Sequence, residues 1–140
     1  MKAIINTDTQ NFLSVTRDSS TVVLGENKFG DGIYNHVGVD VILEAGTVLG
    51  RVNSTDKIAF FDGGAATGLE NILGVLPEDT VVTAGDQSIP FAESGMISEG
   101  KLVFENGEVL TDIVGGRTVR DKFKTDNLGI DLVLSQELSR

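Results

Sequence analysis

Glycine is the residue that most limits what this chain can fold into. Seventeen glycines and only two prolines lie among its 140 residues, and most segments between the glycines are short and rich in Val, Ile, Leu, Thr and Phe. Short runs of strand-forming residues separated by frequent turn residues are typical of all-β proteins. The sequence therefore predicts a mainly β domain that is compact and of the sandwich or barrel type.

Residues from Val37 onward follow this pattern most closely. Gly46 comes after Glu44-Ala45, where it can adopt a positive φ without steric cost. Asn106-Gly107 is a strong hairpin dipeptide, after which residues 108–110 can pair back. The strands that we expect are 37–43, 47–52, 57–62, 72–76, 80–84, 88–97, 101–105 and 130–135.

One segment, residues 118–127, predicts a short helix. Val119 and Phe123 are spaced i, i+4, which places them on one helical face. Thr118 can cap the first turn, and two lysines near the end suit the helix dipole. The expected core consists of Val48, Phe60, Ile72, Val75, Val103, Phe104 and Phe123.

The first 37 residues have a different composition. They mix polar residues and glycine with brief apolar runs, which predicts an N-terminal extension over 1–37 with one or two weak strands, followed by the β domain over 38–140. Residues 1 to about 20 contain too little apolar surface to fold alone, so we expect them to become ordered only on a partner. The alternative, that they complete the sheet of this protein, stays open.

Apolar residues within this extension are candidates for partner contact. An extended segment can add a strand to an exposed sheet edge, where backbone hydrogen bonds give affinity and side-chain pockets give register. The candidate contact residues are Ile4, Ile5, Phe12, Leu13 and Val15.

Charge and cysteine content limit the possible partners. The chain has a net charge of −10 and a pI near 4.4, so nucleic acid and anionic membrane surfaces would repel it. It contains no cysteine, which excludes disulfides and thiolate metal sites. The first ten residues lack the apolar region of a signal peptide, and no run approaches about 18 apolar residues. We therefore expect a soluble protein, without nucleic-acid or membrane partners, that is not exported by a standard route.

Residues that carry catalytic chemistry are few. His36 is the only histidine, and its Gly-rich surroundings favour a loop residue over a catalytic base or a zinc ligand. The stretch 30–35 lacks the third glycine of a phosphate-binding loop. Residues 62–71, DGGAATGLEN, have acidic ends that could hold calcium weakly, but a solvated loop is the favoured interpretation. We expect neither enzymatic activity nor a cofactor.

The order of segments from Leu43 to Val133 resembles the head decoration proteins of tailed bacteriophages, the family of the phage lambda capsid-stabilising protein. The resemblance lies in LEAGTVLGRV, then KIAFFD, then GGAATGLEN followed by ILGVLPEDT, then AGD before SGMISEGKLVF, and TVRDKFKTDNLGI near the end. It covers roughly 95 residues. The chain has no tryptophan, unlike the phage lambda member, and its residues 1–37 have no match there.

The resemblance implies a β-tulip-type domain with an extended N-terminal arm that joins a strand of the capsid protein. Such proteins bind the outside of the mature, expanded head, usually as homotrimers, and stabilise it against internal pressure. The implied partner is the major capsid protein. The implied location is the outer surface of the virion, after synthesis in the host cytoplasm.

Two other interpretations compete with this one. A carbohydrate- or surface-binding β module of a tail or fibre would need a cluster of exposed aromatic residues. A carrier domain of the biotinyl or lipoyl type would need a lysine at a hairpin tip, and Lys57 and Lys101 are the lysines among the central strands.

Overall fold

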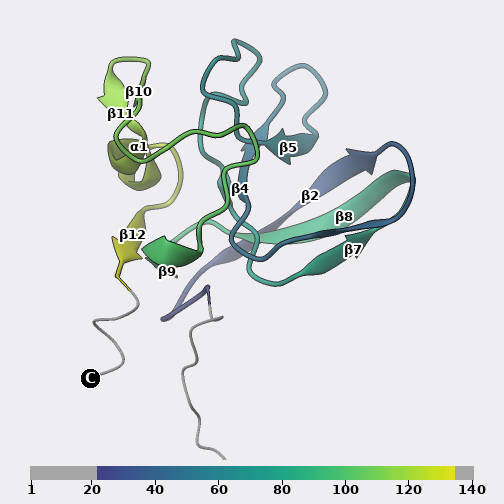
Figure 1. Ribbon diagram of the computed structural model, residues 1–140, viewed down its shortest axis with the longest axis horizontal. Helices are drawn as coiled ribbons and strands as arrows, with labels where there is room; N and C mark the ends of the chain where they lie inside the picture. Colours follow the sequence, from purple (N-terminus) through teal and green to yellow (C-terminus); the bar gives the residue numbers. More distant parts are fainter. Residues whose placement is uncertain (1–21, 135–140) are drawn as a thin grey trace, which may run out of the picture.

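A computed structural model describes residues 22–134 of the chain, and this part is mainly β (Figure 1). It contains one α-helix and one short 3-10 helix, so the predicted fold class is confirmed. The elements are β2 (Phe29–His36), β3 (Val41–Leu43), β4 (Val48–Arg51), β5 (Ile58–Phe60), β6 (Gly74–Val75), β7 (Thr80–Val82), β8 (Gly85–Ala92), β9 (Gly95–Ser98), η2 (Glu99–Lys101), β10 (Ile113–Val114), β11 (Arg117–Thr118), α1 (Val119–Thr125) and β12 (Ile130–Val133).

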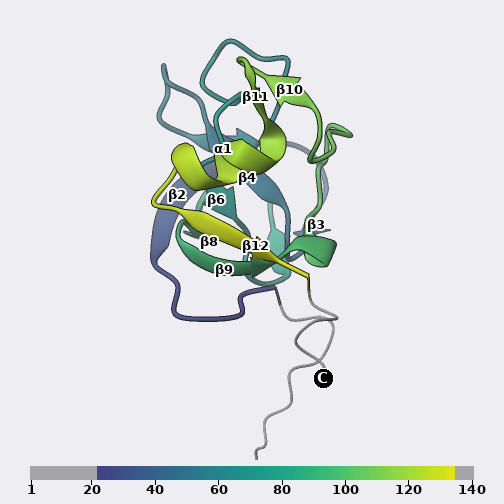
Figure 2. The same ribbon diagram turned by 90° about the vertical axis from the view of Figure 1, so that its left-hand side faces the viewer.

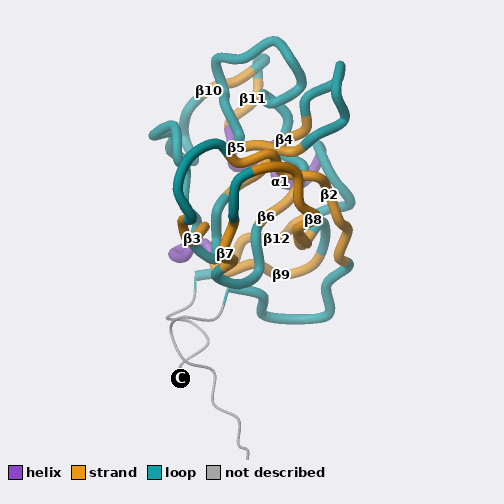
Figure 3. Tube along the Cα trace, turned by 90° about the vertical axis from the view of Figure 1, so that its right-hand side faces the viewer, coloured by secondary structure: helices purple, strands orange, loops and turns teal. Residues whose placement is uncertain are grey.

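Five strands close into a barrel in the order β2-β5-β4-β6-β8. The longest pairing joins β2 and β8, which run antiparallel in register from Phe29 opposite Ala92 to His36 opposite Gly85. These two strands form a long ribbon that extends to one side of the molecule in Figure 1 and is seen end-on in Figure 3. A second antiparallel pair, β3 and β7, lies beside this ribbon.

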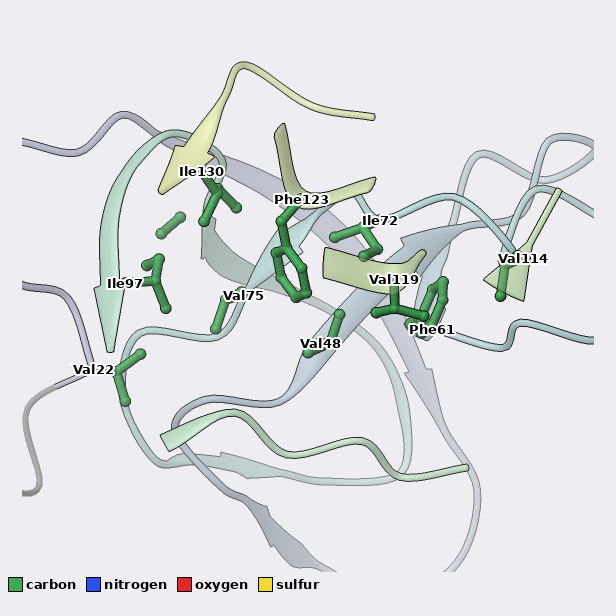
Figure 4. Close-up of a cluster of buried hydrophobic side chains, with 11 residues drawn as sticks. Val22, Val48, Phe61, Ile72, Val75, Ile97, Val114, Val119, Phe123 and Ile130 are labelled. Atoms are coloured by element: carbon green, nitrogen blue, oxygen red, sulfur yellow. The ribbon is translucent and has the colours of Figure 1, made fainter. Parts of the chain in front are cut away.

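The two faces of β4 contribute to two different hydrophobic clusters. Val48 belongs to a cluster beneath α1, whereas Leu49 belongs to a cluster between the barrel strands and the β3–β7 pair, because successive residues of a strand point to opposite faces. Figure 4 shows the first cluster. It contains Val22, Val48, Phe61, Ile72, Val75, Ala92, Ile97, Val114, Val119, Phe123 and Ile130. The second contains Tyr34, Leu43, Leu49, Ile58, Leu76, Val82, Ile89 and Phe91.

Helix α1 forms where the sequence predicted it. The Thr118 hydroxyl accepts a hydrogen bond from the Asp121 amide at 3.1 Å and so caps the first turn. Val119 and Phe123 are fully buried and pack over β4 and β6 (Figures 2 and 4). A helix of seven residues is not stable by itself, so this buried stripe holds it in place.

Two acidic turns that the sequence separates meet in the fold. The Ala45 amide donates to Asp79 Oδ1 at 2.8 Å, and the Gly46 amide donates to the Leu76 carbonyl at 2.7 Å. Gly46 has a φ of 95°, as the sequence predicted. The turn before β4 and the turn before β7 are therefore one connected structure, and Asp79 has a structural role in it.

The described part of the predicted N-terminal extension packs against the domain. Val22 is buried in the first cluster, and β2 is a barrel strand of eight residues, which is more regular structure than the weak strands expected. The sequence did not indicate β2 as a regular strand because it contains glycines, which are depleted in strands. Gly32 is required there by close packing, since a Cβ at this position would lie 2.5 Å from Ile58 Cγ2. Residues 1–21 lie outside the described range.

The strand expected over residues 37–43 begins only at Val41. The chain must reverse direction between β2 and β3, and residues 37–40 form this reversal. The His36 ring lies at its start, with Nε2 at 2.6 Å from the Val39 carbonyl oxygen. His36 is thus the last residue of β2 and not the loop residue that we expected.

The predictions for residues 101–110 are also wrong. In place of a strand, η2 ends at Lys101 and Val103 makes a single parallel bridge to Thr47. Asn106-Gly107 is not flanked by paired strands, and the Asn106 side chain donates to the Phe61 carbonyl at 2.9 Å. The hairpin of this region is β10–β11, which turns at Gly115-Gly116.

Four of the seven expected core residues are fully buried. Val48, Ile72, Val75 and Phe123 are at most 1% exposed. Phe60, Val103 and Phe104 are only half-buried. Phe60 and Phe104 pack against the edges of the two clusters, and Phe61 takes the buried position expected of Phe60. In an apolar run as short as 57–62, the alternation does not show which of two adjacent aromatics points inward.

Candidate docking surfaces

The five residues that the sequence singled out for partner contact, Ile4, Ile5, Phe12, Leu13 and Val15, all lie outside the described range. Candidate sites in the described part of the chain therefore lie on the surface of residues 22–134. Two features stand out there, a pocket at the start of the described chain and an apolar tip at the end of the β2–β8 ribbon.

The ionisable groups with shifted pKa values have structural partners. Hydrogen bonds from Asn35 and Lys57 lower the pKa of Asp86, and two hydrogen bonds from Arg120, at 2.8 and 2.9 Å, lower the pKa of Glu99. Burial, together with the charge of Glu105, raises the pKa of Tyr34. The partners of Asp86 and Glu99 therefore favour the ionised form of both carboxylates.

Asp126 is the most strongly engaged carboxylate. Its side chain is 5% exposed and lies 2.8 Å from both Lys122 Nζ and Arg117 Nη2. It also accepts a hydrogen bond from the Ile72 amide at 3.2 Å. Burial opposes its ionisation, but these three donors outweigh burial and lower its pKa. The group joins the end of α1 to the loop before β6, so its role is structural.

Neither of the candidate lysines lies at a hairpin tip. Lys57 Nζ is 3.1 Å from Asp86 Oδ1 and ties the start of β5 to the ribbon, and Lys101 ends η2. In the loop 62–71, acidic side chains accept hydrogen bonds from the backbone of the same loop. The Gly64 amide donates to Asp62, and the Gly68 amide donates to Glu70. Within residues 22–134, no group of three or more His, Asp or Glu side chains is placed to hold a metal ion.

An open pocket of about 810 Å³ lies where the described chain begins. This volume is in the range of ligand sites. Most of its lining residues are apolar, and they include both prolines of the chain and Phe29, whose side chain is exposed. Two carboxylates, Glu78 and Asp79, add negative charge. The lining residues are Val22, Val23, Phe29, Ala45, Pro77, Glu78, Asp79 and Pro90.

One wall of this pocket carries an open strand edge. Segment 22–24 pairs antiparallel with β9, through Leu24 N–H to the Met96 carbonyl at 3.0 Å and Ser98 N–H to the Val22 carbonyl at 2.9 Å. In such a pair, the amide and carbonyl of the residue between these bonds point away from the partner strand. Val23 is that residue, and within the described chain neither its N–H nor its C=O has a hydrogen-bond partner.

The apolar tip lies at the right-hand end of the ribbon in Figure 1. Val37 and Val39 in the β2–β3 reversal are 85% and 80% exposed. Ile42 and Val81, which are cross-strand partners in β3 and β7, are each 62% exposed. Single exposed apolar residues are normal on a protein surface, but four of them in the β2–β3 reversal and the adjoining β3–β7 pair are typical of an interaction surface.

Comparison of the sequence with models of protein families gives no match, and comparison with curated proteins gives none either. Within residues 22–134, the single α-helix falls far short of the length and hydrophobicity that crossing a membrane requires.

Proposed function

We propose that this protein is a head decoration protein of a tailed bacteriophage, which binds the outside of the expanded capsid as a homotrimer and stabilises it. The observation that carries the proposal is the order of sequence segments over residues 43–133, which resembles this family. Those segments form one β domain with a single short helix, which agrees with the fold that the family implies.

The surface properties support a binding role. The pocket with its open strand edge and the apolar tip are both suited to protein contact. A net charge of −10 keeps free copies apart before they dock. A trimer that engages three sites on a capsid gains avidity, typically 10²–10⁴-fold, so each single contact can be weak. Ile4, Ile5, Phe12, Leu13 and Val15 remain the proposed contacts of the N-terminal residues.

A carbohydrate-binding module is less well supported. Sugar sites use exposed aromatic rings, and Phe29 is the one aromatic side chain among the large exposed apolar residues of 22–134. A single ring in a pocket does not make the flat aromatic face that such a module needs.

Co-sedimentation with capsids tests the proposal. Purified protein is mixed with expanded heads that lack their decoration protein, from the phage that carries this gene, and with unexpanded heads as the control. Binding to expanded heads, with greater resistance of those heads to heat, is the expected result. Failure to bind expanded heads, or binding only to unassembled coat subunits, would contradict the proposal.

A further inference from the structure

We propose that the pocket beside Val23 holds an extended segment of the coat protein, which pairs as an added strand with residues 22–24. This inference rests on the proposed function and names the surface of the folded domain that takes part. It differs from the contact predicted for residues 1–21, because here the domain is the host of the strand and the coat protein supplies it.

The open edge is the first observation. Among residues 22–134, the Val23 N–H and C=O have no hydrogen-bond partner, and both point to the side away from β9. Val22 and Val23 also line the pocket, so a strand lying there would have a donor and an acceptor within reach. The sheet would then run from the added strand through 22–24 and β9 to β12. Strand addition of this kind derives its affinity from backbone hydrogen bonds.

The pocket walls define the side chains of the added strand. Alternate residues of a strand point to the same face, so every second residue of the guest would enter the pocket. Phe29, Pro77 and Pro90 offer apolar surface to these residues. The segment should therefore carry apolar side chains at alternate positions.

The charge at the pocket indicates which charged residue the guest segment should carry. Asp79 already accepts a hydrogen bond from the Ala45 amide, whereas the Glu78 carboxylate has no hydrogen bond or ion pair in the described chain. A lysine or arginine on the guest would pair with Glu78. Electrostatic complementarity of this type raises the association rate and fixes register.

This charge argues against a guest from the same protein. Residues 1–21 contain two basic side chains, Lys2 and Arg17, and two acidic ones, Asp8 and Asp18. They offer Glu78 no net complement, and a second copy of the chain also carries a net charge of −10. The charge balance therefore favours a basic guest from a different protein, and on the proposed function that protein is the coat subunit.

Two pairs of variants test the edge and the charge, with undecorated expanded heads as the probe. Val23→Pro removes the free N–H but leaves the bonds to β9, which use Val22 and Leu24; Val23→Ile keeps the N–H and is its control. Glu78→Lys reverses the free charge, and Asp131→Lys makes the same change at an exposed β12 residue without described partners. We expect Val23→Pro and Glu78→Lys each to weaken binding by about tenfold and the two controls to change it by less than about twofold.

A cross-link identifies the guest even if a variant fails to fold. Benzoylphenylalanine in place of Phe29 puts a photoreactive ring in the pocket, and mass spectrometry of irradiated complexes reads the attached peptide. A coat-protein peptide with alternating apolar residues and a nearby Lys or Arg is the expected product. Attachment to residues 1–21, to a second copy, or to nothing while the heads stay decorated overturns this inference and leaves the proposed function standing. If the protein does not bind heads at all, the proposed function fails and the inference fails with it.

Discussion

Asp126 and Lys122 form a buried ion pair, whereas each of the other ion pairs within residues 22–134 includes an exposed side chain. Lys122 is 2% exposed, and its ammonium group lies 2.8 Å from Asp126 Oδ2. Removing one partner of such a pair leaves an uncompensated charge in a site that water cannot reach. These two residues should therefore be far more sensitive to substitution than the other ion pairs of the described chain.

Replacement of Asp126 by asparagine should destabilise the protein strongly. It leaves the Lys122 charge buried without its counter-ion, and this typically costs about 3–5 kcal/mol. Denaturant unfolding monitored by circular dichroism measures the loss. Asp131→Asn is the control, since this exposed carboxylate has no described partner and its loss should change stability by less than about 0.5 kcal/mol. Equal effects of the two variants would show that the pair contributes nothing.

Stability should also fall in acid through Asp126. Its pKa in the folded protein is lowered, so the unfolded chain, with an ordinary aspartate pKa of about 3.9, binds the proton more readily. The stabilisation is complete above this value and is lost as the pH falls through the lower, folded value. The unfolding free energy of the wild type should therefore decline below about pH 4 more steeply than that of Asp126→Asn. Parallel curves for the two proteins would contradict this.

Phe123 should be the most important side chain of α1. Its ring is fully buried and meets Phe104 edge to face at 6.4 Å between centroids. Phe123→Ala should lower the unfolding free energy by about 3–5 kcal/mol. Phe29→Ala is the matched control, because this ring is 54% exposed, and it should change stability by less than about 1 kcal/mol. A small effect at Phe123 would mean that α1 does not hold the barrel as described.

At the scale of the elements, the turn at Gly46 connects three parts of the chain. Its amide donates to Leu76 and its carbonyl accepts from Val103. A Cβ at Gly46 would lie only 1.8 Å from the Lys101 carbonyl oxygen, whereas a Cβ at Gly38 would meet nothing within 4 Å. Both glycines have a positive φ, of 95° and 109°. Comparing alanine substitutions at the two positions therefore separates the effect of backbone strain from the effect of steric clash.

Gly38→Ala should therefore show the strain alone and Gly46→Ala the strain plus the clash. We expect a loss of about 1–2 kcal/mol for Gly38→Ala and of more than about 3 kcal/mol for Gly46→Ala. Thermal and denaturant unfolding of the two variants measure the difference. If both lose the same amount, the loop of Lys101 moves aside without penalty and the turn is not a fixed junction.

The sequence predicted elements best where local signals agreed. Helix α1 has a cap at Thr118 and a two-residue apolar stripe, and strands β4 and β7 have Val-rich runs beside clear turns; all three were correct. Strand β2 was underestimated because it contains two glycines, of which Gly30 packs closely against Phe91 and Gly32 against Ile58. The β10–β11 hairpin turns at Gly115-Gly116, where φ is 62° and 85°. A Gly-Gly pair is also a hairpin signal, but the prediction placed the hairpin at the nearby Asn106-Gly107.

The candidate docking surfaces could not be predicted in the same way. The pocket joins residues that are far apart in the sequence, from Val22 to Pro90, and only the folded chain brings them together. The free edge of Val23 depends on its pairing with Ile97. A sequence pattern shows which residues are adjacent along the chain. It does not show which distant residues lie together on the folded surface.

At the scale of the whole molecule, residues 22–134 contain two buried clusters of their own. Within this range the cluster members run from Val22 to Ile130. The sheet that contains β9 likewise uses residues 22–24 as its edge. Binding and folding should therefore depend on different parts of the sequence, which a truncation can separate.

Deletion of residues 1–20 should abolish most capsid binding while leaving the folded domain intact. The deleted stretch contains all five proposed contact residues, Ile4, Ile5, Phe12, Leu13 and Val15, and its removal leaves every cluster member of residues 22–134 in place. We expect the melting temperature of the truncated protein to lie within about 2 °C of the full chain, since a loss of even 1 kcal/mol would shift it by several degrees in a domain of this size. Co-sedimentation with expanded heads should fall at least tenfold in the same preparation. If the truncated protein instead melts far lower, these residues complete the sheet of this protein at the Val23 edge and do not serve as an arm for the capsid. If it keeps its melting temperature and also its binding, the contacts with the capsid come from the folded domain alone, through the pocket or the apolar tip.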